Sequence, residues 1–322
     1  MLELITRMTA VSITSNQSSL PRQYRASGIG SKACDLIHLK SKGVIFGAIS
    51  RGIFIKTDSR WLIFISYEPY PGPLTINVPA ARDAGIVLEP GEQVDIASGR
   101  LTLKEDELVI TTQHLSTWQP VPTGLADYPS SGLQRRLVAA AEIVTSSGKT
   151  NGLSVLLPYW MPIQGQARKG PEQMAHWYEI ILNLVRNTNV IQSPASIIEL
   201  LGAGPGLTPS GDDFTIGFLL TLNRWQHVLP ASIDLDKFNQ QVVSAAYQKT
   251  TTLSANLIEC AAQGLADQRL VNALDWLVAG KLDNLQAVED LLSWGNSSGG
   301  DAFVGFVVAL SPWISELQSG SA

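Results

Sequence analysis

The hydrophobic positions of the chain change their period near its first third. From Gly43 to about Thr112, short apolar or alternating runs such as VIFGAIS, WLIFISY and ELVITT are separated by Gly, Pro, Asp and Asn. Runs of this kind predict β-strands. They recur about every 8 to 15 residues, which leaves no room for crossover helices. The pattern therefore favours an antiparallel sheet or a small barrel over a parallel sheet.

After the segment Gln119–Gly124, the apolar period approaches 3.6 and indicates helices. Helices are predicted at 133–145, 172–187, 194–202, 211–226, 235–263, 268–279, 284–294 and 300–310. We therefore predict an α+β protein, with a β-rich domain over 1–125 followed by an α-helical domain over 126–322. Residues 146–171, rich in Gly, Pro, Ser and Gln, predict one long irregular loop that could serve as a lid.

Composition narrows the classes of function. A hydrophobic content of 45% with only 16% charged residues excludes disorder of the whole chain. The net charge of -5 offers no basic excess for nucleic acid, and the apolar stretches fall short of the roughly 20 residues of a membrane helix. We expect neither an export signal nor a membrane partner. Cys34 and Cys260 lie too far apart for a disulfide framework or zinc knuckle, which fits a cytoplasmic protein.

Three short motifs fail when their context is considered. Gly148–Thr150 lacks the first glycine of a phosphate-binding P-loop. Gly295–Gly299 matches the nucleophile-elbow string but follows a predicted helix, and no histidine follows it. Gly202–Gly206 lacks the spacing of a dinucleotide fingerprint. These strings do not predict a nucleotide site or a Ser-His-Asp hydrolase.

A repeat is the strongest internal signal. Ser210–Phe218 (SGDDFTIGF) aligns with Ser298–Phe306 (SGGDAFVGF), with identities at positions 1, 2, 4, 8 and 9. Each copy follows a glycine-rich turn, opens an apolar helix and has the Ser-x-x-Asp form of a capping box, in which Ser and Asp would cap their own helix. A purely structural interpretation is two capped, buried helices that cross closely at Gly217 and Gly305.

The functional interpretation rests on the unusual composition of 202–213, which contains glycines, prolines and two adjacent carboxylates. Glycine-rich turns at helix N-termini expose N–H groups that bind anions. We therefore predict a pocket in which these amides hold a phosphate or carboxylate. Asp213 or Asp301 would accept hydrogen bonds from an amino or amide group, or hold a divalent cation. The candidate catalytic residues are Asp213 and Asp301, and the candidate substrate-binding residues are Gly204, Gly206, Thr208, Ser210, Gly211, Asp212, Ser254, Ser298 and Gly299.

Four hydroxyls and an amide lie together in Thr250–Asn256 (TTTLSAN), inside the predicted helix 235–263. They could line a functional site, which is why Ser254 is a candidate. Alternatively, they bond to the preceding turn or cap a helix that starts at Thr252. The sequence leaves both alternatives open.

The string Leu201–Phe214 (LGAGPGLTPSGDDF) resembles the signature of a bacterial family assigned as a subunit of oxamate carbamoyltransferase, an enzyme of anaerobic allantoin breakdown. The segments Thr251–Ala255 and Ser298–Asp301 resemble the same pattern. The resemblance covers about the last 200 residues and implies interconversion of oxalurate plus phosphate with oxamate plus carbamoyl phosphate. It also implies that other carbamoyltransferase subunits are partners.

Backbone amides and an acidic acceptor would suit oxamate, carbamoyl phosphate and phosphate as small anionic ligands. No resident cofactor or metal is predicted, although a divalent cation remains open. One departure is that phosphate sites usually recruit Arg, and only Arg224 lies near either copy. The alternative is a non-catalytic metabolite-binding or scaffold subunit. A third hypothesis is a metal-dependent enzyme that uses Asp212, Asp213 and Asp301.

Overall fold

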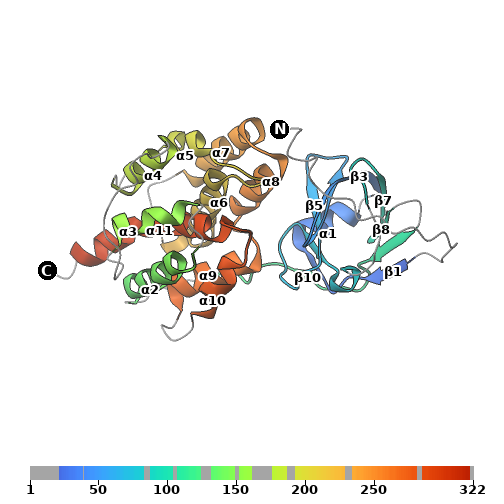
Figure 1. The fold of residues 1–322 in the computed structure, drawn as a ribbon, viewed down its shortest axis with the longest axis horizontal. Helices are drawn as coiled ribbons and strands as arrows, with labels where there is room; N and C mark the ends of the chain where they lie inside the picture. Colours follow the sequence, from blue (N-terminus) through green and yellow to red (C-terminus); the bar gives the residue numbers. More distant parts are fainter. Residues whose placement is uncertain are drawn as a thin grey trace. The chain divides into compact units, whose positions relative to one another are not determined.

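The chain divides into two compact units, residues 1–119 and 120–322 (Figure 1). The structure is a computed structural model. It describes residues 22–38, 40–82, 88–103, 107–124, 132–148, 152–161, 176–186, 193–228, 234–280 and 285–319. The first unit is built mainly of strands and the second of helices, so the α+β class predicted from the sequence is confirmed.

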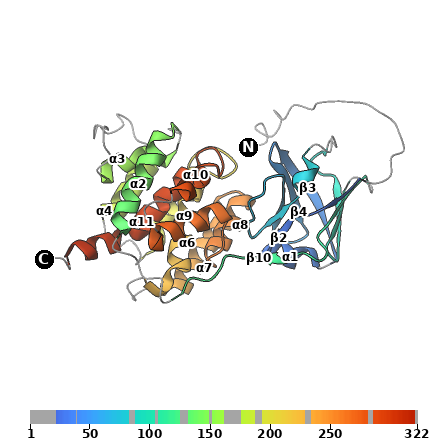
Figure 2. The ribbon, with the colours of Figure 1, turned by 90° about the horizontal axis from the view of Figure 1, so that it is seen from below.

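The first unit contains a curled sheet, a half-barrel (Figure 2). It has ten strands in the order β1-β9-β8-β7-β3-β4-β5-β6-β2-β10. Most neighbouring strands are antiparallel, as expected, but β1–β9, β5–β6 and β2–β10 are parallel. In the β5–β6 connection, the Asn77 side chain donates hydrogen bonds to the carbonyls of Glu68 and Tyr70. The strands are β1 (Arg22–Arg25), β2 (Gly28–Gly30), β3 (Ser41–Ile49), β4 (Gly52–Thr57), β5 (Leu62–Ser66), β6 (Thr75–Asn77), β7 (Gln93–Ala97), β8 (Arg100–Leu103), β9 (Leu108–Thr111) and β10 (Thr117–Trp118).

One helix, α1 (Ser31–His38), lies inside the half that the sequence pattern predicts as all-β. It contacts β2 and β10 at one end of the strand order and β7 in its middle, which requires the sheet to curl. Ala33 and Ile37 of α1 are buried in the same apolar core as Ile55 and Ile63 of the sheet. The helix therefore fills the concave side of the half-barrel.

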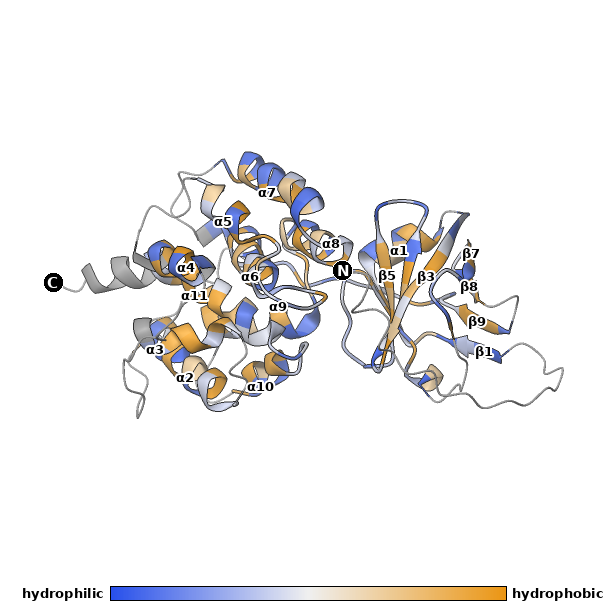
Figure 3. Cartoon of the chain, turned by 45° about the horizontal axis from the view of Figure 1, so that its top comes forward, coloured by the Kyte–Doolittle hydropathy of each residue, from blue (hydrophilic) through white to orange (hydrophobic). Residues whose placement is uncertain are grey.

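The second unit is helical, as predicted. Its elements are α2 (Leu133–Ser146), η3 (Leu153–Leu156), α3 (Leu157–Trp160), α4 (His176–Arg186), α5 (Ala195–Leu200), α6 (Ser210–Arg224), η5 (Gln226–Val228), α7 (Leu235–Lys249), α8 (Thr252–Ala261), α9 (Gln268–Ala279), α10 (Gln286–Leu292) and α11 (Ser298–Ser319). Figure 3 shows hydrophilic residues on the outer helix α7 and a hydrophobic interior around α6 and α11. None of the helices in the described ranges is long and apolar enough to cross a membrane.

Two segments differ from the sequence expectation. The predicted helix 235–263 is two helices, α7 and α8, with Thr250 and Thr251 between them. Residues 146–171 are not irregular throughout, because they include η3 and α3, in which Leu153, Leu156 and Leu157 are fully buried. Residues 149–151 and 162–171 of the suggested lid lie outside the described residues.

The two repeat copies form the central helix pair of the second unit. Every residue of α6 from Ser210 to Leu222 is buried, and α6 packs against α11. A Cβ added at Gly217 would overlap the carbonyl of Ala302, and a Cβ at Gly305 would overlap the carbonyl of Phe214. Position eight of each copy thus meets position five of the other, and the close crossing predicted from the two glycines is present.

Candidate functional site

The repeat extends beyond the two nine-residue copies. At position two of each copy, a Cβ on Gly211 would overlap the carbonyl of Leu200 in α5, and one on Gly299 would overlap the carbonyl of Leu291 in α10. Each copy is therefore the second helix of a helix–turn–helix, α5–α6 in one case and α10–α11 in the other. These two glycines face the preceding helix, so their role in the structure is close packing.

The capping box predicted for the first copy is wrong. Helix α6 begins at Ser210, and its N-cap residue is Pro209, which makes no side-chain capping bond. The serine therefore lies one position inside the helix, where its side chain is not placed to cap the first turn. The Asp301 carboxyl of the other copy instead accepts a hydrogen bond from the Leu153 N–H of η3.

Serine and aspartate act across the copies rather than within them. The Ser298 hydroxyl of the second copy forms a hydrogen bond with the Asp213 carboxyl of the first copy. The Ser210 hydroxyl of the first copy likewise forms one with the Asp301 carboxyl of the second copy. Both interactions lower the pKa of the carboxyl concerned. The N-termini of α6 and α11 therefore meet, and four of the candidate residues converge on one small polar site.

The Asp213 side chain has no solvent-exposed surface. Its Oδ2 atom accepts a hydrogen bond from the Thr208 hydroxyl at 3.2 Å, whereas its Oδ1 atom has no hydrogen-bond partner among the described residues. Burial raises the pKa of Asp213 well above its usual value, and the nearby Asp301 carboxylate raises it further. The hydroxyls of Ser298 and Thr208 act in the opposite direction.

Asp301 is equally buried, and its Oδ2 atom has no hydrogen-bond partner among the described residues. Burial raises its pKa to about 6, against the lowering effects of the Leu153 N–H and the hydroxyls of Ser210 and Ser297. Two buried carboxyls that repel each other cannot both ionise easily near neutral pH. The pair is therefore expected to retain a proton.

Sequence reasoning missed three residues beside Asp301. Leu153 supplies its N–H, and Gly152 leaves the space for that approach, because a Cβ there would overlap the Asp301 carboxyl. Burial raises the pKa of the Tyr178 hydroxyl on α4, and the charge of Asp301 raises it further. In the sequence, the only feature that marks Gly152 and Leu153 is a glycine followed by an apolar run. Nothing in the local sequence pattern indicates Tyr178.

Asp212 holds the glycine-rich loop in place. Its Oδ1 atom accepts from the Gly202 N–H at 2.8 Å, and its Oδ2 atom accepts from the Thr250 hydroxyl. Burial raises the pKa of Asp212, while Thr250, Gly202 and Ser254 lower it. Both oxygens of this candidate substrate-binding residue are thus engaged within the chain, and Ser254 is buried beside it.

The hydroxyl-rich segment Thr250–Asn256 caps helix α8 and forms a hydrogen bond with the glycine-rich loop. Helix α8 starts at Thr252, and the Thr251 hydroxyl accepts from the Ser254 N–H as its N-cap. This agrees with the structural alternative left open by the sequence. The same Thr251 hydroxyl donates to the Leu207 carbonyl, so the segment also fixes the loop before α6.

The loop itself is the exposed side of the site. Gly204 and Gly206 have φ angles of +109° and +107°, which L side chains rarely adopt. Gly206 and Leu207 are exposed, and Thr208 is only partly buried. The Thr208 Oγ1 atom lies 3.2 Å from the Ser298 Oγ atom as well as from Asp213. Thr208 therefore lies between the exposed loop and the buried carboxyl pair.

Among the described residues of the second unit, three arginines with buried side chains, Arg136, Arg224 and Arg269, are committed elsewhere. Arg269 pairs with Asp267. Arg224 forms a bidentate pair with Asp275, with both N–O distances at 2.6 Å. Arg136 donates to the carbonyls of Leu277 and Val278 at the end of α9. In the described part of the chain, no group of three or more His, Cys, Asp or Glu side chains is arranged to hold a metal ion.

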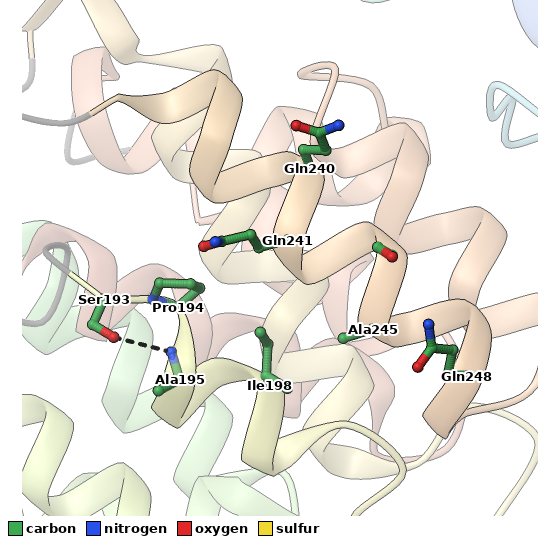
Figure 4. A pocket seen from close by; sticks show the side chains of 9 residues that line it. Ser193, Pro194, Ala195, Ile198, Gln240, Gln241, Ala245 and Gln248 are labelled. Atoms are coloured by element: carbon green, nitrogen blue, oxygen red, sulfur yellow. Dashed lines mark hydrogen bonds between the residues drawn. The ribbon is translucent and has the colours of Figure 1, made fainter.

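A separate open groove of about 660 Å³ lies between the start of α5 and the face of α7 (Figure 4). Amide and small side chains line it, and none of the predicted site residues does. The lining residues are Ser193, Pro194, Ala195, Ile198, Gln240, Gln241, Ser244, Ala245 and Gln248.

The fold and the site together define an α+β protein whose helical unit carries a duplicated helix–turn–helix and a buried pair of carboxyls. Residues 200–310 match the family described as oxamate carbamoyltransferase subunit AllH. The match begins at the end of α5 and ends within α11, so it encloses both repeat copies. The chain resembles that subunit over this segment, as the signature string indicated. No solved structure matches the chain.

Proposed function

We propose that the chain is a subunit of a carbamoyltransferase that interconverts oxalurate plus phosphate with oxamate plus carbamoyl phosphate. The observation that carries the proposal is the convergence of two helix N-termini on Asp213 and Asp301, within the segment that resembles the oxamate carbamoyltransferase subunit. The partners would be other subunits of that enzyme, acting in allantoin degradation in the cytoplasm.

The chemistry of the ligands suits this site. Oxamate carries a carboxylate and an amide, and carbamoyl phosphate carries a phosphate and an amide. The positive ends of α6 and α11 favour an anion, and the loop before α6, in which Gly206 is exposed, would offer backbone N–H groups to it. The carboxyl pair, fully buried in this conformation, is a proton acceptor and, while it holds a proton, a proton source for the reaction.

Transfer of a carbamoyl group from nitrogen to a phosphate oxygen depends on orientation, charge stabilisation and movement of a proton. It needs no protein nucleophile. Since the buried arginines among the described residues, Arg136, Arg224 and Arg269, are committed to other contacts, we propose that partner subunits supply cationic groups that hold the phosphate.

The experiment is to measure carbamoyl phosphate formation from oxalurate and phosphate by the partner subunits with this chain omitted, added as wild type, or added as Asp213→Asn or Asp301→Asn. Activity should require the chain and should fall at least a hundredfold with either variant, while assembly by size-exclusion chromatography is unchanged. Asp236→Asn on α7, which is exposed, is the matched control and should retain full activity.

The second candidate is a scaffold subunit that binds a metabolite without taking part in the reaction. The complete burial of Asp213 and Asp301 favours it, because neither side chain has surface for a ligand in this conformation. Activity that requires the chain but tolerates both Asn variants would support this candidate and contradict a role for the carboxyls in turnover. Absence of activity in every mixture would contradict both.

A further inference from the structure

The buried carboxyl pair reaches the exposed loop through one hydroxyl group. The Thr208 Oγ1 atom lies 3.2 Å from Asp213 Oδ2 and 3.2 Å from Ser298 Oγ. Thr208 is partly exposed, whereas Asp213 and Asp301 are fully buried. A ligand bound at the glycine-rich loop would therefore meet Thr208 before it met either carboxyl.

The groups around Asp213 and Asp301 do not favour two negative charges on this pair of carboxyls. The titratable groups that face it among the described residues are Asp212 on α6 and Tyr178 on α4, and neither supplies a positive charge. The meeting N-termini of α6 and α11 stabilise one negative charge and oppose a bound cation. A proton is therefore a better neutralising partner for the second carboxyl than a metal ion.

We infer that Thr208 relays protons between the buried Asp213–Asp301 pair and a reactant bound at the glycine-rich loop. The inference rests on the proposed function for the identity of the reactant, a carbamoylated amide. It assigns Thr208 as the group that touches the reactant, with Asp213 and Asp301 acting through it. Asp213 Oδ1 and Asp301 Oδ2 have no hydrogen-bond partner among the described residues, so each is open to carry the proton that the pair retains.

The relay matches the proton balance of the reaction. A phosphate oxygen forms a bond to the carbamoyl carbon, and the bond from this carbon to the amide nitrogen breaks with its electron pair going to nitrogen. Hydrogen phosphate loses one proton and the leaving nitrogen gains one. Protonated Asp213 supplies a proton to the leaving nitrogen through the Thr208 hydroxyl and recovers one from the hydrogen phosphate by the same route. The pair ends the reaction with one proton, as it began.

The chain alone tests the relay without any turnover. The carboxylic acid band in the infrared spectrum, assigned by its change in Asp213→Asn, should be present at neutral pH. After a pH jump, its rate of change should fall at least tenfold in Thr208→Val and stay unchanged in Thr208→Ser. Thr145→Val on α2 is the matched control, since Thr145 is also partly buried and its hydroxyl, among the described residues, donates to the Ala141 carbonyl of its own helix.

An unchanged rate in Thr208→Val overturns the relay, and so does a band that appears only after treatment with EDTA, because a cation would then occupy the pair. In the assembled enzyme, Thr208→Val should lower kcat about a hundredfold or more with a smaller change in KM, whereas Thr208→Ser stays close to wild type. Inactive mixtures with intact relay kinetics would reject the proposed function alone. Active enzyme with unaltered kinetics in Thr208→Val would reject the relay alone.

Discussion

At the scale of single residues, the central feature is a pair of carboxyls that costs the fold stability. Asp213 and Asp301 are fully buried, and each has one oxygen without a hydrogen-bond partner in the described residues. Removing a carboxylate from water costs several kcal/mol unless it is paired. Two hydrophobic residues would fill the same space at lower cost. The stability of the fold therefore does not account for the pair, whereas the proposed proton-transfer role does.

The pH dependence of stability should expose the pair. The folded-state pKa of Asp301 is raised from 3.8 to about 6, and that of Asp213 is raised well above 3.8. At a pH between the unfolded-state pKa and the folded-state pKa of such a carboxyl, the folded protein binds more protons than the unfolded protein. For Asp301, the stabilising contribution is complete below about pH 4 and is lost as the pH rises through 6. For Asp301 this amounts to about 3 kcal/mol. Urea unfolding from pH 4 to 7 should show the decline.

Asp301→Asn should flatten that decline and be at least as stable as wild type at pH 7, because no charge is buried there. Asp236→Asn, on the exposed side of α7, should keep the wild-type slope. A wild-type protein that gains stability between pH 4 and 7 would show that the carboxylates are paired with a positive charge, contrary to the arrangement described above.

At the scale of elements, the sequence predicted α6 and α11 because each has a glycine-rich start followed by an apolar run. It failed on the capping box of the first copy because the Ser-x-x-Asp pattern is local, whereas the contacts join distant segments. Thr208 and Ser298 are 90 positions apart, and Leu153 and Asp301 are 148 apart. No pattern within one helix can report such pairs.

Dependence on contacts that a local sequence pattern does not show also explains the other differences between the predicted and observed elements. The apolar period continues through Thr250 and Thr251, so it predicted one helix where Thr251 starts a new one as its N-cap. Helix α1 is only eight residues long and lies between strands. Parallel pairing of β5 and β6 depends on a connection held by Asn77, which strand periodicity does not show. Element types were predictable, while their contacts were not.

The crossing of α6 and α11 should be the element contact most sensitive to added volume. Gly217→Ala and Gly305→Ala each place a methyl group against the backbone of the other helix, at Ala302 and Phe214. Each should lower the free energy of unfolding by about 1–3 kcal/mol or more, because backbone cannot move aside without separating the helices. Urea unfolding at fixed pH measures the change.

Gly300→Ala on α11 is the matched control for this crossing. A Cβ there would lie 3.6 Å from Ser154 and 3.7 Å from Val144, which is ordinary contact. It should be neutral or stabilise by up to about 1 kcal/mol, since Ala is the better helix former. Equal destabilisation by all three substitutions would mean that glycine is required by the helices themselves and not by their crossing.

At the scale of the whole molecule, each unit has its own apolar core. The core of the first unit includes Ile55 and Ile63, and that of the second includes Phe214, Phe218 and Phe303. The two sets share no residue. Buried carboxylates in the described residues, Asp212, Asp213 and Asp301, all belong to the second unit. Acidic and neutral conditions should therefore affect the two units differently.

We accordingly expect two transitions in a calorimetric scan of the full chain, of which only the one from residues 120–322 moves with pH. A change of about 3 kcal/mol in a unit of this size shifts its midpoint by roughly 6–12 °C, with the higher midpoint near pH 4. Asp301→Asn should reduce that shift, whereas Ile55→Val should lower only the other midpoint, because it removes a buried methyl group from the first core. A single transition that responds to both substitutions would show that the units unfold as one cooperative body. The pH sensitivity would then belong to the molecule and not to the helical unit that carries the site.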